Sequence, residues 1–155
     1  MPNDPTDRLL NGVPVPLTQA ESDQLAAEEA AFEARPVTAD MVDRERDRRL
    51  VLDFTFNGVV FQRDAAAVKR INGAGTLALA AIIGGAQPGD LRWHGEDTDF
   101  AWIAKDNSLV TMDAQTTLAF GQAAAKVETL LVFAAKALKA MDPIPADYRD
   151  DAYWQ

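Results

Sequence analysis

The chain has 155 residues, and 24 acidic against 15 basic side chains give it a formal net charge of −9 at pH 7. This length fits one domain with an appended arm, and a hydrophobic content of 48% is ordinary for a protein with a buried core. The negative charge argues against a nucleic-acid partner, because binding to phosphates requires a face rich in Lys and Arg. Because cysteine is absent, disulfides, thiolate zinc sites and thiol nucleophiles are excluded.

The N-terminus has neither the basic stretch nor the apolar stretch of a secretory signal, so we expect a protein made in the cytoplasm. The longest apolar run, residues 77–83, has seven residues, whereas a membrane span needs about 20. We therefore expect no membrane insertion.

The first 17 residues are expected to form an extended arm, because they contain four prolines. An Asn11-Gly12 dipeptide lies between apolar residues, which is typical of a tight hairpin turn. Pro14 and Pro16 weaken this signal, since proline cannot donate to a strand ladder. An edge ribbon or a peptide-like strand is the most that such a segment can form.

A helix is expected directly after the arm. Thr18 and Glu21 match a capping box, in which each residue satisfies a backbone amide of the other, so the helix begins there and ends before Pro36. Its apolar content is thin, because Leu25 and Phe32 lie seven residues apart with alanines between them. Such a narrow stripe suits docking on a neighbour better than supporting a core.

A second helix is expected from Thr38, and it carries alternating charges over residues 43–49. This alternation is typical of a solvated helix with i,i+4 pairs such as Glu45–Arg49. The alternative, an anion-binding arginine cluster, is diluted by the interleaved acids. Residues 1–49 are thus predicted to form an extended arm and helices.

The clearest local signal is a hairpin at Asn57-Gly58, which fits a type I′ turn with φ > 0 at both central residues. The two-residue loop fixes the register, so that Phe54 faces Phe61. One face of this hairpin is then apolar, and it consists of Leu52, Phe54, Phe56, Val59 and Phe61.

A third helix is expected after this hairpin. Asp64 is a good N-cap for it, and Gly84-Gly85 would end it. Gly73 and Gly75 lie in its middle, where glycine is unfavourable. They indicate either close packing or a break in the helix.

Two further strands, at residues 100–104 and 109–112, are joined by a turn-rich loop and predict a second hairpin. Asp113 then caps a long helix that reaches Met141 and ends before Pro143. The apolar stripe of this helix repeats in steps of three and four residues and consists of Phe120, Ala124, Val127, Leu131, Ala134, Leu138 and Met141.

These elements predict an α+β fold class, in which two β-hairpins pack with two helices over residues 50–142, preceded by an N-terminal helical arm. Residues 143–155 place Tyr148, Tyr153 and Trp154 among acids. We predict a C-terminal docking tail here, and packing of these aromatic side chains within the chain is the alternative.

The residues needed for common catalytic sites are scarce. Two serines and the single His94 lack the sequence context of a nucleophilic pair. The loop at residues 94–99 lacks the ligand set of a zinc site and the spacing of a calcium loop, and the glycines match no phosphate-binding loop. We therefore expect no catalytic activity, no catalytic or metal-binding residue and no cofactor.

Two interpretations stay open around this loop. Trp93 and Trp102 flank it, and core packing is the more frequent role of such aromatic side chains, with a surface for a sugar or peptide as the alternative. Sequence spacing carries no information on a carboxylate pair for glycosidic cleavage, because such pairs assemble across a fold.

Two stretches resemble phage proteins. Residues 11–18, with the sequence NGVPVPLT, and the charged helix around residues 44–50 resemble the N-terminal region of small bacteriophage and prophage proteins encoded beside tail-fibre genes. Residues 56–62 and 102–112, with the helices that follow them, resemble an uncharacterised bacteriophage/prophage domain family found in tail-fibre-region proteins. The resemblance covers about residues 9–141 and contains no catalytic motif.

The resemblance implies a phage virion structural protein, associated with the tail as a fibre, tail-tip or baseplate component, that acts by protein–protein assembly and host recognition. Such a protein is made in the host cytoplasm and is located in the virion. One alternative is a cytosolic tail-fibre assembly chaperone. The other is an accessory glycan-cleaving enzyme, with Glu96, Asp97 or Asp99 as candidate acids.

The expected partners are other phage tail proteins, a second copy of the chain through the N-terminal helices, and a host surface receptor. We expect partner contacts from side chains of the arm, the first helix and the C-terminal tail, namely Leu10, Val13, Val15, Leu25, Phe32, Tyr148, Tyr153 and Trp154.

Overall fold

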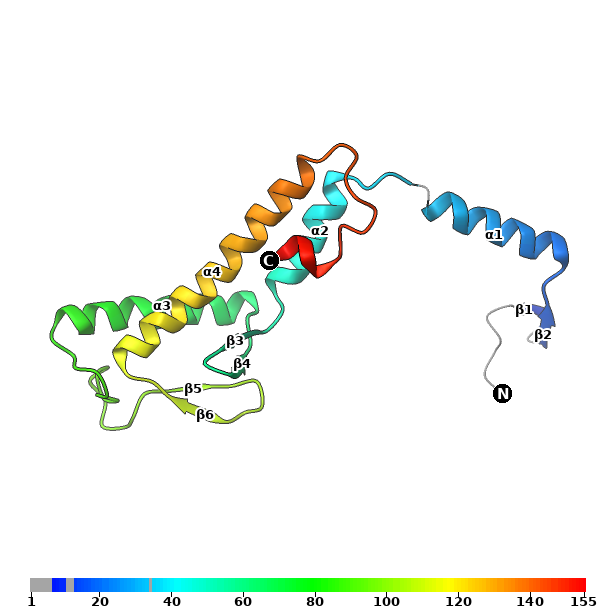
Figure 1. Cartoon of the computed structure of the whole chain (residues 1–155). Coiled ribbons are helices and arrows are strands. Elements are labelled where there is room, and N and C mark those ends of the chain that lie inside the picture. The colour runs from blue at the N-terminus through cyan, green and yellow to red at the C-terminus, as the bar shows by residue number, and fades with distance from the viewer. Residues whose placement is uncertain (1–6, 11–12, 34) are drawn as a thin grey trace. The chain divides into compact units, whose positions relative to one another are not determined.

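The structure is a computed structural model that describes residues 7–10, 13–33 and 35–155, with side chains described from residue 15 onward except at residues 32 and 33. The chain divides into two compact units, Met1–Pro36 and Val37–Gln155. Figure 1 shows the elements of each unit with the labels used below.

The first unit begins with a ribbon of two strands. Strands β1 (Asp7–Leu10) and β2 (Val13–Pro16) pair antiparallel, with Leu10 opposite Val13. This pairing has the register expected for a hairpin at Asn11-Gly12, and the turn itself lies outside the described residues.

Helix α1 (Gln19–Glu33) follows and begins at the predicted capping box. The Thr18 backbone amide and hydroxyl donate to Glu21 Oε2 at 2.8 and 2.7 Å, and the Glu21 amide donates to Thr18 Oγ1 at 3.4 Å. The box satisfies backbone donors that a helix N-terminus otherwise leaves unpaired. The start of α1 is therefore fixed by residues that are close together in the sequence.

The second unit opens with helix α2 (Ala39–Leu50), which begins after Thr38 as predicted. Strands β3 (Phe54–Phe56) and β4 (Val59–Phe61) form the predicted hairpin, with Phe54 opposite Phe61. The Asn57-Gly58 turn has φ of 49° and 80°, as a type I′ turn requires. Leu52 lies before the strand and is exposed, so its predicted place on the apolar face is wrong.

Helix α3 (Ala65–Ile83) is capped as predicted, because the Asp64 side chain accepts a hydrogen bond from the Ala67 amide. It ends at Gly84, and Gly85 has a φ of 98° that favours glycine. The helix is continuous through its internal glycines.

The second hairpin consists of β5 (Ala101–Ile103) and β6 (Leu109–Thr111). It is joined to the first hairpin by a hydrogen bond from the Lys105 amide to the Val60 carbonyl at 2.9 Å and by an ion pair between Lys105 and Asp53. The two hairpins thus lie side by side although each is a separate two-stranded sheet.

Helix α4 (Ala114–Lys139) is the longest element, and Asp113 caps it. One carboxylate oxygen of Asp113 accepts from the Thr116 amide and the other from the Gly89 amide, both at 2.7 Å. The cap therefore also ties the preceding loop to the helix. Met141 lies beyond the helix end and is exposed, so the predicted stripe is one turn too long.

Phe120 of α4 lies at the centre of the first of two hydrophobic clusters. Its ring contacts those of Phe54, Phe61 and Trp102 at centroid distances of 5.3, 4.7 and 5.3 Å. We call this cluster the hairpin core, and its buried members are Phe54, Phe61, Ile71, Ala104, Met112, Phe120 and Ala124.

Helices α3 and α4 cross above the hairpins (Figure 1). Gly75 and Gly121 meet at this crossing, where a Cβ built on Gly121 would lie 3.6 Å from the Gly75 Cα. Of the two readings of Gly75, close packing is therefore correct. A Cβ on Gly73 would meet nothing within 4 Å, so packing does not explain that glycine.

A second cluster lies along the C-terminal half of α4, where α2 and residues 143–155 cover it. We call it the terminal core, and its buried members are Val42, Leu131, Ala135, Leu138, Tyr148 and Trp154. The compact unit Val37–Gln155 is therefore wider at both ends than the predicted 50–142. The prediction placed α2 in the arm because its sequence is mostly charged, and the apolar residues that pack on α4, such as Val42, are few.

Candidate functional site

In the first unit, the residues expected to contact partners differ in their exposure and in whether the structure describes their side chains. Val15 is half-buried and Leu25 is 53% exposed. Leu10 and Val13 lie in the β1–β2 ribbon and Phe32 lies in α1, but their side chains lie outside the described part of the structure. Leu25 is thus the expected contact residue that the structure places on a surface.

The C-terminal aromatic residues lie in the terminal core of their own chain. Tyr148 is 3% and Trp154 is 6% exposed, and Tyr153 packs partly buried against the same cluster. The Trp154 indole donates to the Tyr148 carbonyl at 2.8 Å, and the Arg49 guanidinium lies 5.0 Å from the Trp154 ring centroid. The prediction of a docking tail is therefore wrong for these side chains. Burial in the terminal core removes their aromatic surface from water, and the indole N–H has a hydrogen-bond partner there.

The charged face of α2 is not merely a solvated surface. Glu45 is 5% exposed and accepts hydrogen bonds from Arg48 at 2.6 Å and from Arg49 at 2.7 Å. Arg49 also donates to the Arg149 carbonyl at 2.7 Å and pairs with Asp151 at 2.8 Å. The predicted Glu45–Arg49 pair exists, and the structure adds that it holds the C-terminal segment on α2.

The Glu45 carboxylate is stabilised in its charged form. The hydrogen bond from Arg48 lowers its pKa, burial opposes this effect, and the hydrogen bond from Arg49 lowers it further. The cluster is therefore a structural ion-pair network with its positive charges already engaged.

The loop around His94 shows packing and solvated carboxylates. Trp93 donates its indole N–H to the Met112 carbonyl at 3.0 Å, and its ring lies 4.8 Å from that of Phe100, tilted by 53°. Asp99 accepts from Arg92 at 3.3 Å. Across the described residues, no three His, Asp or Glu side chains gather in a metal-binding arrangement. The packing of Trp93 and Trp102 on the hairpin core favours the core role over a ligand surface.

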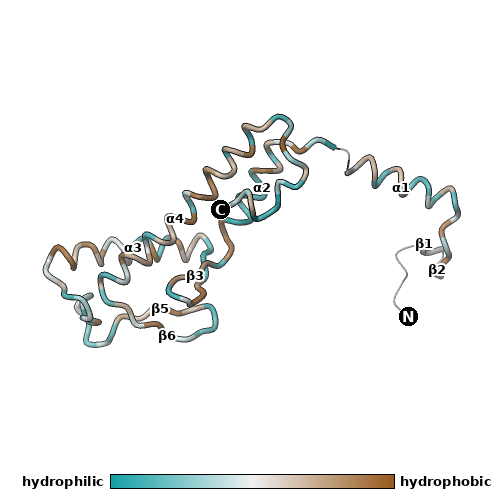
Figure 2. Tube along the Cα trace, viewed as in Figure 1, coloured by the Kyte–Doolittle hydropathy of each residue, from teal (hydrophilic) through white to brown (hydrophobic). Residues whose placement is uncertain are grey.

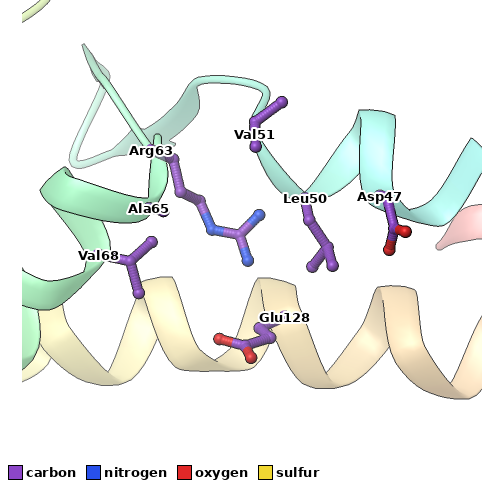
Figure 3. Close-up of a pocket in the computed structure, with 7 residues that line it drawn as sticks. All are labelled: Asp47, Leu50, Val51, Arg63, Ala65, Val68 and Glu128. Carbon is purple, nitrogen blue, oxygen red and sulfur yellow. The ribbon is translucent and has the colours of Figure 1, made fainter. Parts of the chain in front are cut away.

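A pocket of about 390 Å³ lies between α2, α3 and α4. Arg63 points into it from the segment between β4 and α3, and Figure 3 shows its guanidinium among Leu50, Val68 and Glu128. The Arg63 side chain is 1% exposed, and its Nε and Nη1 have no hydrogen-bond partner among the described residues. A buried donor without a partner is unusual, and each one costs about 1–3 kcal/mol.

The pKa of Arg63 is also shifted by its surroundings. Burial lowers the pKa of the Arg63 guanidinium, and the nearby Glu128 carboxylate opposes that effect. Asp47 is a second carboxylate in the lining, while Leu50, Val51 and Val68 supply apolar walls. This pocket combines one buried positive charge with two carboxylates and an aliphatic surface.

Sequence analysis did not identify Arg63, although a signal was available. Side chains alternate between faces along a strand, so Arg63 falls on the same side as buried Phe61, with exposed Gln62 between them. A charge at an inward position directly after an apolar strand points to a buried site.

Apolar side chains also lie on the surface of the compact unit. Figure 2 shows hydrophobic stretches along α3 and α4. Large apolar side chains that are more than half exposed include Leu77, Ile83, Ile103, Leu109 and Phe133. Where such side chains form a contiguous patch, the patch is typical of a contact site.

Helices α3 and α4 each contain a window of mean hydropathy 1.3 and are long enough to cross a membrane. A mostly buried core helix of a water-soluble protein passes the same test. Both helices contribute to the hairpin core, and 22% of the apolar stretch of each is buried. Lys126 and Glu128 lie near the middle of α4, where a charged side chain is costly in hydrocarbon. These two central charges argue against α4 as a membrane span.

Comparison with known proteins gives one match. The family described as "Domain of unknown function (DUF4376)" matches residues 33–153, which include all of Val37–Gln155 but its last two residues. No curated protein and no solved structure matches the chain significantly. The family match extends through α2 and includes Tyr148 and Tyr153, and it ends one residue before Trp154. The chain therefore belongs to the DUF4376 family.

Proposed function

We propose that this protein is a structural component of a phage virion, associated with the tail in a fibre, tail tip or baseplate, and that it acts by protein–protein assembly. Other phage tail proteins are its partners, and it self-associates through the N-terminal helix α1. The resemblance of residues 9–141 to proteins of tail-fibre regions supports this assignment.

The observation that carries the proposal is the exposure of α1 within its own unit. Every side chain from residue 23 to residue 31 is exposed. An isolated helix of 15 residues is marginal in water, because most helix stability in proteins comes from tertiary packing. Leu25 on α1 is 53% exposed, so a second copy of this helix would give it an apolar surface.

The compact unit adds a second kind of contact surface. Its large apolar side chains that are more than half exposed include residues of α3, α4 and the second hairpin, whereas the aromatic side chains of its C-terminal segment are buried in the terminal core. Contacts with other tail proteins are therefore expected on the helix and hairpin surfaces and not on Tyr148 or Trp154.

Mass spectrometry of purified particles tests this function. The proposal expects the protein in particles at a fixed ratio to known tail proteins. Abundance in the infected cell with absence from purified particles would contradict it and would favour the assembly chaperone.

A further inference from the structure

The Arg63 pocket has a charge pattern that a zwitterion would match. Arg63 presents donors and no acceptor, and its Nε and Nη1 are buried without a partner among the described residues. Arginine binds carboxylates through a planar fork of N–H groups. The buried guanidinium therefore favours a ligand with a carboxylate.

The rest of the lining argues against a simple anion. Glu128 and Asp47 place two carboxylates in the lining. Asp47 is already paired with Arg46 at 2.7 Å, whereas Glu128 would repel a simple anion. A simple cation would instead meet Arg63. A ligand with both a carboxylate and an ammonium group places an opposite charge beside Arg63 and beside Glu128.

The walls between these charges are aliphatic. Leu50 and Val51 come from the end of α2, and Val68 comes from the first turn of α3. A volume of about 390 Å³ lies within the range of small-molecule sites. The wall chemistry calls for a short, branched hydrocarbon chain on the ligand.

We propose that this pocket binds a small aliphatic amino acid, with its carboxylate on Arg63, its ammonium group toward Glu128 and its side chain against Leu50, Val51 and Val68. Pairing with a carboxylate would also offset the effect of burial on the pKa of Arg63. This site is separate from the assembly surfaces proposed above.

An NMR titration of the full chain with L-leucine tests the proposal. Two half-ligands serve as comparisons: 4-methylpentanoate has the carboxylate without the ammonium group, and 3-methylbutylamine has the reverse. We expect saturable shifts of the Leu50, Val51 and Val68 amides, with leucine binding on the order of tenfold more tightly than either half-ligand.

Glu128→Gln is the decisive variant, because Glu128 is exposed and its replacement leaves the core intact. It should weaken leucine binding several-fold, and binding of 4-methylpentanoate should be unchanged or tighter. Glu96→Gln makes the same chemical change at an exposed position outside the pocket and should change neither. Arg63→Lys, checked for folding by its spectrum, should weaken both carboxylate ligands.

Three results would overturn the proposal. The first is the absence of saturable leucine shifts at the pocket. The second is that leucine binds no more tightly than 4-methylpentanoate to the wild type, and that Glu128→Gln changes the affinity of neither ligand. The third is an Arg63 Nε–H resonance that responds to Glu128→Gln and not to leucine, because this would show an internal ion pair alone.

Discussion

The two units of the chain are held together over very different distances in the sequence. In Met1–Pro36, the described contacts join near neighbours, such as Thr18 with Glu21 three residues apart. In Val37–Gln155, Arg49 donates to the Arg149 carbonyl 100 residues away, and Phe61 packs against Phe120. The compact unit therefore contains the packing that stabilises it, whereas α1 has a well-defined start and little surface buried within its unit.

The largest expected effect is in the terminal core. Trp154→Ala removes a buried aromatic side chain and its hydrogen bond, so we expect a loss of about 3–5 kcal/mol in the free energy of unfolding. Phe120→Ala in the hairpin core should cost a similar amount. Chemical denaturation of the full-length variants measures both effects.

Phe133→Ala is the matched control, because Phe133 is an aromatic side chain on α4 that is 62% exposed. Its removal should change stability by less than about 0.5 kcal/mol. If Trp154→Ala is as mild as this control, the C-terminal segment is a docking tail after all and the comparison of the two units fails.

A smaller loss is expected when the ion-pair network is broken. Glu45→Gln removes the carboxylate that Arg48 and Arg49 share, while Arg49 keeps its pair with Asp151, and we expect a loss of about 1–3 kcal/mol at neutral pH. Asp40→Asn on the same helix is the control, because Asp40 is exposed and has no hydrogen bond or ion pair among the described residues. Equal stability of both variants would contradict a structural role for the network.

The network also predicts a pH dependence. The folded-state pKa of Glu45 lies below its ordinary value of 4.5, so the unfolded state takes up a proton first as the pH falls. The contribution of Glu45 is therefore complete above about pH 4.5 and is lost as the pH falls through the folded-state pKa. Denaturation between neutral and acid pH should show a steeper loss for the wild type than for Glu45→Gln.

The helix caps compare the two units directly. Asp113→Ala should cost about 1 kcal/mol in the global unfolding of the compact unit, with Asp113→Asn retaining much of the cap. Thr18→Ala should lower the helix content of α1 and leave that unfolding transition unchanged, because Thr18 lies in the other unit. A shared loss in both variants would show that the two units unfold together.

Local patterns were enough to predict most of the fold. The Asn57-Gly58 turn gave the correct register of the first hairpin, and Asp64 and Asp113 marked the starts of α3 and α4. These signals involve residues within a few positions of one another, where turn geometry and capping act without tertiary context. The hairpin core followed from the apolar faces of the same elements.

The terminal core was missed because its evidence is distributed along the chain. Val42 is one apolar residue in a charged helix, and Tyr148 and Trp154 lie in a segment without regular periodicity. Their burial depends on contacts between α2, α4 and the chain end, which no local pattern reports. The Arg63 pocket was missed for a related reason, since its walls come from three separate helices.

The central claim, that α1 is an assembly element whose apolar side is covered by a partner, is tested most directly by the mass of the full chain in solution. Light scattering coupled to size-exclusion chromatography should show an oligomer of the 16.8 kDa chain. Leu25→Glu should shift it toward the monomer, and Ala27→Glu, which adds the same charge two residues along α1, should not. A monomeric wild type, or equal masses for the two variants, would contradict the claim.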